Sequence, residues 1–174
     1  MKKIHKHIII LIILFTTTAN IKAEMPYYLD FKYILNESLA GKDAQLKLKD
    51  KLNNGINSLA KKEKSIQEEE KKLISQKKIL KADEYKNKVQ ELRSKVADLQ
   101  KQRNKLLQGV SDQRAKAKTK LLKNLNPIIK EYMKEKNIRM VLDKKSLLLA
   151  DENLNITKDV MDLLNKKLKS IKID

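Results

Sequence analysis

Two heptad repeats mirror each other across a short turn in this chain. Apolar residues recur every seven positions before and after the turn, at Leu52, Leu59, Ile66, Leu73 and Leu80, then at Tyr85, Leu92, Leu99 and Leu106. Positions whose numbers sum to 165 lie level with each other, so Leu80 faces Tyr85 and Leu59 faces Leu106. This spacing predicts a long antiparallel coiled-coil hairpin, which buries a narrow seam and leaves little interior for a catalytic pocket.

The two helices of this hairpin have predictable limits. We expect the first from Lys42 to about Leu80 and the second from about Asp83 to Lys136, roughly 58 Å and 80 Å at 1.5 Å per residue. Only Lys81 and Ala82 remain for the turn. Pro127 lies inside the second helix, where proline is expected to kink the helix or start a new segment.

One side of the seam is predicted to be polar. Residues whose numbers sum to 166 meet there, namely Ile56, Glu63, Glu70 and Lys77 with Val110, Arg103, Val96 and Val89. Glu63 faces Arg103, and an ion pair between them would fix the register more than it would add stability. Two solvated charges beside the seam are the alternative.

The first 23 residues are typical of a cleaved secretory signal peptide. Lys2 and Lys3 precede an apolar run over residues 8–15, and small and polar residues follow up to Ala23. The run is shorter than the roughly 20 residues that span a membrane, which disfavours a retained anchor. The whole chain has 40 basic and 22 acidic residues; without the four lysines of this segment, 36 basic residues remain and the net charge is +14.

The composition argues against an enzyme. The chain contains no cysteine or tryptophan, and both histidines, His5 and His7, lie in the predicted signal peptide. Thiol catalysis, histidine acid–base chemistry and the commonest zinc ligands are therefore absent from the mature chain. Gly41-Lys42 lacks the other residues of a phosphate-binding loop, and residues 151–155 lack the glycine of a calcium loop. We expect no cofactor and no metal.

The sequence on either side of the hairpin predicts a small body that contains β-structure. Residues 27–29 are expected to form a short strand and residues 31–35 a helical turn, and Gly41 then breaks the helical pattern. Residues 138–142 and 147–150 are expected to form a β-hairpin. Thr157 is expected to cap a last helix, with Asp159 in its first turn and a buried stripe at Val160, Leu163, Leu164 and Leu168.

Three short strands make a poor isolated sheet, so we expect the subunits of an oligomer to complete the body together. The predicted fold class is α+β and mostly α, with a signal peptide over residues 1–23, a body over 24–41 and 127–174, and a helical arm over 42–126. Candidate residues for the contacts between subunits in this body are Tyr28, Leu29, Val141, Leu142 and Leu148.

Two features of the arm are candidates for function. Basic and apolar residues gather at its tip, where mixed contacts suit an unfolded acidic polypeptide: Ile74, Lys77, Lys78, Ile79, Lys81, Lys86 and Lys88. An ordinary solvated surface is the alternative.

Gly55 and Gly109 lie at the same level of the hairpin and are hinge candidates, because glycine weakens a helix by about 1 kcal/mol relative to alanine. Chance or close helix packing would equally explain them.

Two blocks of sequence resemble the Skp/OmpH family of periplasmic chaperones. The first runs from Tyr28 through Ser38 to Gly41-Lys42, and the second from Ile138 through Asp143 to Ile156-Thr157-Lys158-Asp159-Val160. The order of signal, strand block, charged hairpin and closing strand-helix block also resembles the family. Asn137, Leu149 and Asn155 depart from it, where relatives commonly have glycine, tyrosine and aspartate.

The resemblance implies a homotrimer in which three helical arms enclose a cavity. It further implies an ATP-independent periplasmic holdase that keeps unfolded outer-membrane β-barrel proteins from aggregating. The alternative from composition is a basic coiled-coil spacer of the cell envelope that binds lipopolysaccharide, an anionic membrane surface or acidic polymers. Nucleic acid is not expected as a partner, because the predicted signal peptide directs the chain out of the cytoplasm.

Overall fold

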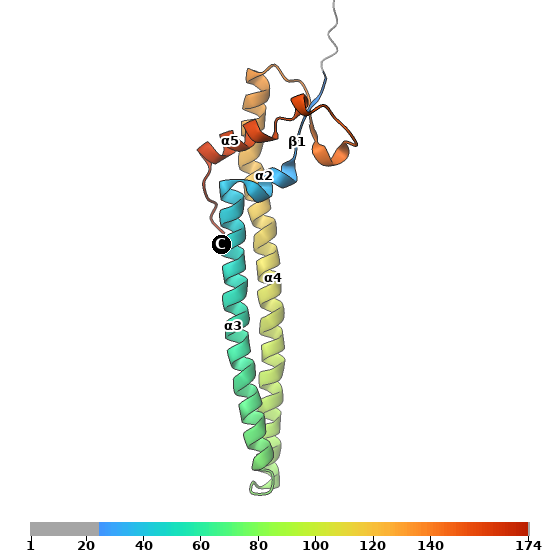
Figure 1. Cartoon of the computed structure of the whole chain (residues 1–174). Helices are drawn as coiled ribbons and strands as arrows, with labels where there is room; N and C mark the ends of the chain where they lie inside the picture. The colour runs from blue at the N-terminus through green and yellow to red at the C-terminus, as the bar shows by residue number, and fades with distance from the viewer. Residues whose placement is uncertain (1–24, 174) are drawn as a thin grey trace, which may run out of the picture.

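The computed structural model describes residues 25–173, which form a long two-helix arm with a small body at one end (Figure 1). Helix α3 spans Leu39–Ser75 and helix α4 spans Ala82–Glu135, with 37 and 54 residues. At 1.5 Å per residue these helices are about 55 Å and 80 Å long. The two helices lie side by side along the arm, which confirms the predicted mostly α fold and its helical hairpin.

Contacts between α3 and α4 agree with the predicted register. Their residue numbers sum to 164 or 166, on either side of 165, and they join Lys62 to Gln102 at 2.6 Å, Glu69 to Lys95 at 2.5 Å and Glu63 to Arg103 at 3.2 Å. The expected ion pair between Glu63 and Arg103 is thus confirmed. Of the seam residues, Leu59 and Leu73 are buried.

The turn at the arm tip is longer than we predicted. Helix α3 ends at Ser75 and α4 begins at Ala82, so residues 76–81 form the turn. The backbone N–H groups of Ile79 and Leu80 both donate to the Gln76 carbonyl oxygen, at 2.9 and 3.0 Å. These local hydrogen bonds turn the chain before Leu80, which we had placed inside the helix.

The arm joins the body at a corner between α3 and helix α2, which spans Phe31–Glu37. We expected Gly41 to end a helical segment, but it lies in the first turn of α3, where its N–H donates to the Ser38 side-chain oxygen at 3.2 Å. A Cβ atom at this position would lie 2.1 Å from the Leu35 carbonyl oxygen. Glycine is therefore required by the close approach of α2.

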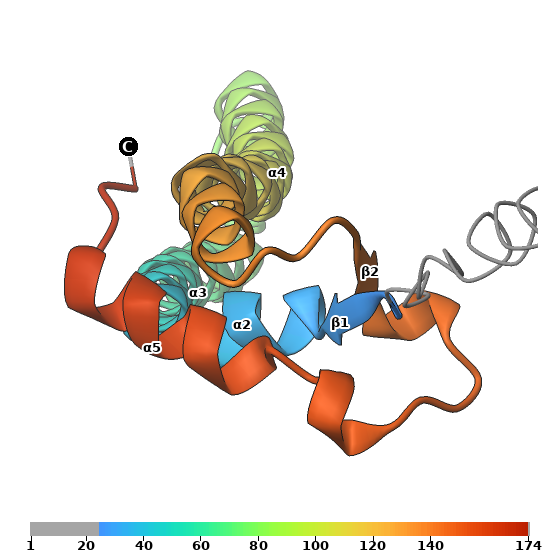
Figure 2. The same ribbon diagram turned by 90° about the horizontal axis from the view of Figure 1, so that it is seen from above.

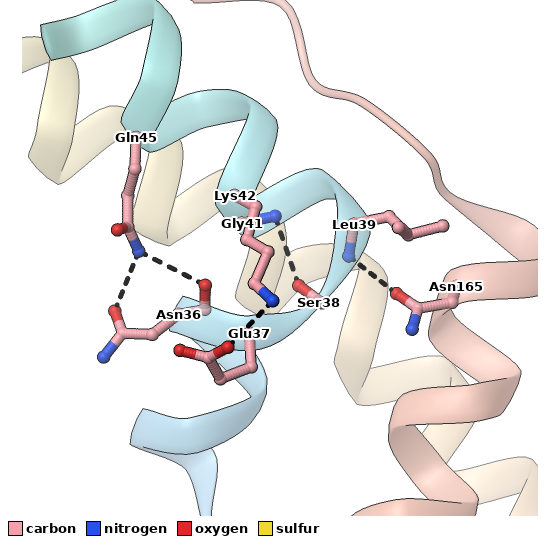
Figure 3. Close-up of polar contacts among 8 residues, drawn as sticks. All are labelled: Asn36, Glu37, Ser38, Leu39, Gly41, Lys42, Gln45 and Asn165. Atoms are coloured by element: carbon pink, nitrogen blue, oxygen red, sulfur yellow. Dashed lines mark hydrogen bonds and ion pairs between the residues drawn. The ribbon is translucent and has the colours of Figure 1, made fainter.

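Polar side chains hold this corner from both sides (Figure 3). Gln45 Nε2 donates to the Asn36 side-chain oxygen at 3.2 Å, and Lys42 forms an ion pair with Glu37 at 2.9 Å. Asn165 comes from the last helix, and its side-chain oxygen accepts the Leu39 N–H at 2.8 Å. The first turn of the arm is thus tied both to α2 and to the C-terminal part of the chain.

The body contains two parallel strands in place of the predicted β-hairpin. Strand β1 (Tyr27–Leu29) pairs with β2 (Val141–Asp143), with Tyr27 opposite Val141 and Leu29 opposite Asp143. Residues 147–150 form no strand, so the hairpin prediction is wrong. The Asp143 side chain accepts the Lys145 N–H at 3.2 Å and starts a 3₁₀ turn, Lys144–Ser146, which leads the chain away from β2.

The other edge of β1 is partly covered by the segment before the last helix. The Ile156 N–H donates to the Tyr28 carbonyl oxygen at 2.9 Å, and Tyr28 forms a parallel bridge with Asn155. Figure 2 shows β1 next to β2 on one side of the body. This arrangement buries β1, whose Tyr28 and Leu29 are 2% and 0% exposed.

The body core lies where α2, α4 and helix α5 (Thr157–Lys167) meet β1. Its fully buried side chains are Leu29, Ile34, Leu125, Val160 and Leu164. The predicted stripe of the last helix is confirmed, since Val160 and Leu164 are buried and Leu163 and Leu168 pack against the same core. Asp159 lies in the first turn of α5, as expected.

Thr157 does not cap α5 as predicted, because it is the first residue of the helix. Its hydroxyl donates to the Asn155 side-chain oxygen at 2.6 Å and accepts the Asp30 N–H at 2.9 Å. The Asn155 oxygen also accepts the Thr157 N–H at 3.1 Å. Thr157 thus connects the end of β1 to the start of α5. The Asn155 side chain accepts the Thr157 backbone N–H, which has no partner within the helix.

Helix α4 continues through Pro127 as one helix, so of the two expected outcomes, a kink or a new segment, the new segment is not present. Asn137 has a φ of 54°, in the left-handed region that favours glycine. The Ile138 N–H donates to the Met133 carbonyl oxygen at 2.8 Å, and the Asn137 N–H donates to the Lys134 carbonyl oxygen at 3.4 Å. This is the Schellman pattern of a helix C-terminus, with asparagine in the place usually taken by glycine.

The C-terminal residues return to the base of the arm (Figure 1). Ile171 is 6% exposed and packs in a second cluster with Ala40, Ala44, Ala117 and Leu121, which come from α3 and α4. Lys120 Nζ also donates to the Lys172 carbonyl oxygen at 2.8 Å. This segment covers a small-residue contact between the two arm helices, a contact that the sequence alone did not reveal.

Candidate functional site

The predicted contact residues of the arm tip lie together at the end farthest from the body. Ile74 in α3 is 61% exposed, and Ile79 in the turn is 82% exposed. Five exposed lysines surround them, from the turn and the first two turns of α4: Lys77, Lys78, Lys81, Lys86 and Lys88. The tip therefore presents apolar and basic side chains to solvent at the same place.

A groove of about 410 Å³ lies between the two helices just behind the tip. Apolar side chains form most of its lining, with Glu70 and Arg93 as the polar members: Ile66, Leu73, Ile74, Tyr85, Val89, Leu92 and Val96. Val89 and Val96 were predicted on the polar side of the seam and were not among the predicted contact residues. Their seven-residue spacing beside the seam was the available signal.

The two hinge candidates differ in their surroundings, although both lie inside unbroken helices. A Cβ at Gly55 would lie 2.5 Å from each methyl carbon of Leu106, so Gly55 makes room for this seam residue. A Cβ at Gly109 would have no such neighbour within 4 Å. Close packing therefore accounts for Gly55, while a hinge remains a prediction for the pair.

The candidate trimer residues also differ in their exposure. Tyr28 and Leu29 are buried within their own chain, and Val141 and Leu142 are half-buried in β2. Leu148 is 96% exposed, and its neighbour Leu149 is 91% exposed. Of these candidates, Leu148 has the most surface left for a contact with another chain.

Two tyrosines of the body have raised pKa values. Burial, followed by a 2.6 Å hydrogen bond from its hydroxyl to Asp159, raises the pKa of Tyr132 to about 12. Burial also raises the pKa of Tyr28, and the Glu152 carboxylate raises it further. The hydrogen bond of the Tyr132 hydroxyl to Asp159 links α4 to α5.

The comparisons with known proteins agree with this architecture. A family model described as outer membrane protein (OmpH-like) matches residues 27–164. The chain belongs to this OmpH-like family. The match includes both strands, the whole arm and most of α5, but it stops before the C-terminal segment that packs on the arm base.

A solved structure has the same fold as this OmpH-like chain. It is a crystal structure of a candidate outer membrane chaperone (OmpH-like) from Caulobacter crescentus CB15, with a TM-score of 0.82 and 21% sequence identity. The likeness covers 86% of this chain and 90% of the other. Among curated proteins, the comparison finds no match.

Residues 25–173 of the OmpH-like chain contain neither a candidate membrane span nor a candidate metal site. Within this range no helix has the length and apolar character that crossing a membrane requires. The same residues contain no group of three or more histidine, cysteine, aspartate or glutamate side chains placed to hold a metal ion. The predicted signal peptide lies outside the described residues.

Proposed function

We propose that this OmpH-like protein is an ATP-independent holdase of the periplasm that binds unfolded outer-membrane β-barrel proteins and prevents their aggregation. The observation that carries the proposal is the exposed surface of basic and apolar side chains on a long arm that projects from a small body. Family membership supports a chaperone role in general. The signal-like N-terminus supports secretion.

The arm tip suits an unfolded client better than a folded one. Ile74 and Ile79 offer apolar contacts, and the surrounding lysines attract acidic segments over a distance of about a Debye length. Each contact is weak, because the exposed side chains of the tip remain largely solvated. Several arms that act on one client would bind tightly through their combined effect while the client stays mobile.

A homotrimer is the proposed arrangement of those arms. The exposed Leu148 and Leu149 support subunit contacts in the body, since neighbouring large apolar residues with more than 90% exposure are unusual on a monomer. The two-stranded sheet supports the same proposal, because so small a sheet gains from pairing or packing with another subunit.

The alternative function is that of a basic envelope spacer that binds lipopolysaccharide, an anionic membrane surface or acidic polymers. The excess of lysine, with a net charge of +18 for the whole chain, is the observation that favours it. Such a spacer would bind folded or polymeric anions and would lose binding steeply as salt screens the charges. A holdase should prefer unfolded chains and retain part of its affinity in salt, through apolar contacts.

The test is size-exclusion chromatography with light scattering on residues 24–174, alone and mixed with a urea-diluted outer-membrane β-barrel protein, at low and high salt. We expect a trimer that co-elutes with soluble, unfolded client and keeps part of this binding at high salt. A monomer or dimer that leaves the client to aggregate would contradict the proposal. Binding to lipopolysaccharide alone, lost in salt, would favour the spacer.

A matched pair of variants locates the contact. Glutamine at Lys77, Lys78 and Lys81 removes three charges from the tip, and glutamine at Lys61, Lys64 and Lys71 removes three from exposed positions in the middle of α3. If the tip contacts the client, the first variant should slow client capture and the second should not. Equal effects would indicate general charge attraction only.

A further inference from the structure

The segment after α5, residues 168–173, connects the two hydrophobic clusters of the chain. We call this segment the C-terminal strap. Leu168 packs against the body core and also against the cluster at the base of the arm. Ile171 is a buried member of the arm-base cluster, and Ile173 packs against the same cluster. The strap therefore runs from the body to the base of the arm, as Figure 1 shows.

The arm base leaves room for the strap because alanine takes the place of larger residues in the seam. In the register whose residue numbers sum to 165, Ala44 lies level with Leu121 and Ala117 lies level with Leu48. An alanine leaves space and apolar surface between the two helices that a leucine would fill. Ile171 packs in one cluster with both alanines and Leu121. A side chain from outside the hairpin thus completes the seam at this level.

A weak point of α4 lies between the two clusters. Pro127 has no backbone N–H, so the carbonyl group of Lys123 receives no helical hydrogen bond from it, and the proline ring also crowds this carbonyl. Lys123 stands between Leu121, which belongs to the arm-base cluster, and Leu125, which belongs to the body core. Helices bend most readily at such a residue. We therefore expect arm and body to bend relative to each other at this level of α4.

Helix α5 and the strap contact α4 on both sides of this weak point. On the body side, Lys167 at the end of α5 forms an ion pair with Glu131 at 2.5 Å. On the arm side, Lys120 Nζ donates to the Lys172 carbonyl oxygen at 2.8 Å. Because Glu131 follows the missing hydrogen bond and Lys120 precedes it, the strap bridges the weak point from outside the helix.

Few contacts hold the strap in place. Its residues form no helix or strand, and Lys169 and Ser170 are exposed. Fixing such a segment costs backbone entropy, which the burial of Ile171 and the hydrogen bond to Lys172 must offset. Segments with few buried contacts open locally while the rest of the protein stays folded. The strap is therefore able to detach without unfolding the body core.

We propose that the C-terminal strap is a detachable brace that sets the angle between arm and body by bridging α4 at Pro127. With the strap in place, the arm base and the body move as one unit. With the strap released, α4 bends at this level and the arm takes a wider range of angles. The part of α4 from Lys123 to Ala82 extends about 62 Å at 1.5 Å per residue, so a bend of about 10° moves the tip by about 11 Å. The inference goes beyond the proposed function, because it concerns the arm itself, whatever the arm binds.

A matched pair of variants of residues 24–174 tests the brace. Ile171→Asn replaces the buried side chain, and Ser170→Asn places the same side chain at its exposed neighbour; neither changes the charge. Amide hydrogen exchange over residues 118–124 should become about tenfold faster in Ile171→Asn, because the helix opens more often beside the missing bond. The rates should stay unchanged in Ser170→Asn, and over residues 88–106 in both variants. Equal rates over residues 118–124 in Ile171→Asn and the wild type would overturn the inference.

The angle of the arm is the second readout. Spin labels on cysteines placed at Lys78 in the tip and Lys158 in α5 report the distance between tip and body, with labelled chains diluted among unlabelled ones. Ile171→Asn should broaden this distance distribution. Pro127 is exposed, and Pro127→Ala restores the missing helical hydrogen bond, so Ile171→Asn should no longer broaden the distribution in that background. If the broadening persists undiminished, the strap only stabilises the body and the inference is wrong.

A reversible lock keeps the inference testable if Ile171→Asn does not fold. The chain contains no cysteine, so Ala117→Cys with Ile171→Cys introduces a pair without a competing thiol, at two side chains that pack in one cluster. With the disulfide formed, hydrogen exchange over residues 118–124 should fall below the wild-type rate, and dithiothreitol should restore that rate. A disulfide that does not form, or one that leaves the exchange unchanged, would show that the strap does not brace α4.

Discussion

Alanine should stabilise the protein at only one of the two arm glycines, although both lie at the same level of the hairpin. Gly109 is inside α4, and nothing lies within 4 Å of a Cβ added there. Gly109→Ala should therefore gain the full helix preference of alanine, about 1 kcal/mol. The free energy of unfolding should rise by this amount, and Tm should rise by about 2–4 °C.

Gly55→Ala gains the same helix preference of alanine but introduces a steric clash. The new Cβ would lie 2.5 Å from both methyl carbons of Leu106, so this side chain must leave its place in the seam. Forcing an extra methyl group into a packed contact costs about 1–3 kcal/mol. Set against the gain of about 1 kcal/mol, the net change should range from zero to a loss of about 2 kcal/mol.

The assay is guanidinium unfolding followed by circular dichroism at 222 nm, with amide hydrogen exchange of the arm as a local readout. The two variants serve as controls for each other, since the substitution and the helical context are the same. Equal stabilisation by both would show that Leu106 does not constrain Gly55. Destabilisation by Gly109→Ala would show that Gly109 has a packing partner, contrary to its open surroundings.

The same variants test the predicted hinge. Spin labels at Lys78 in the tip and Lys158 in α5 report the distance between the arm tip and the body. If the glycines allow the arm to bend, replacing both with alanine should narrow the distance distribution. An unchanged distribution would remove the hinge prediction and leave close packing at Gly55 as the sufficient explanation.

Three further predictions concern the body and the corner. Gly41→Ala should lower the free energy of unfolding by about 2–3 kcal/mol, because its Cβ would clash with the Leu35 carbonyl oxygen; denaturant midpoints measure this. Asn137→Gly should stabilise and Asn137→Ala destabilise the protein, each by about 1 kcal/mol in thermal unfolding, because φ is 54°. The pKa of Tyr132 is raised in the folded state, so its contribution to stability is complete below pH 10 and is lost as pH rises toward 12. Tyr132→Phe removes the hydrogen bond to Asp159 and should lower the free energy of unfolding by about 1 kcal/mol at pH 8. In urea unfolding, the stability of this variant should fall less steeply with pH above 10 than that of the wild type.

The sequence was sufficient to predict the arm because heptad periodicity determines both the seam and its register. Leu59 and Leu73 are buried as expected, and the ion pair of Glu63 with Arg103 lies at the predicted level. In a repeat that continues over many turns, each heptad independently indicates the same register of the two helices. The ends of the helices depend on single local hydrogen bonds, such as those to the Gln76 carbonyl oxygen, and they were placed with less accuracy.

The body was harder to predict because its contacts join segments that are far apart in the sequence. The pairing of β1 with β2 brings Tyr28 opposite Leu142, and no local pattern distinguishes this parallel pair from a hairpin within residues 138–150. Ile171 packs on Ala40 and Ala117 from a segment without periodicity of its own. Asn137 is intermediate, since it was recognised as a departure from the glycine of the family, but its φ of 54° was not predicted.

Periodicity alone could not determine the character of the side of the seam that we predicted to be polar, which includes Ile56, Glu63, Glu70 and Lys77. Periodicity identifies the residues beside the seam, but both charged and apolar residues occur there. The exposure of these residues and their neighbours on the partner helix decide whether the surface is polar or apolar. Val96 lies opposite Glu70 and is 51% exposed, and the groove contains it together with Ile74 and Val89.

In the proposed holdase, the mixture of apolar and basic side chains along the arm has a physical consequence. Apolar contacts spaced along about 42 Å of α3, from Leu46 to Ile74, and separated by positive charges favour many weak and exchangeable positions of a client over one tight position. A client held in this way could move along the arm without dissociating, and retention would depend on the number of arms around it more than on any single residue.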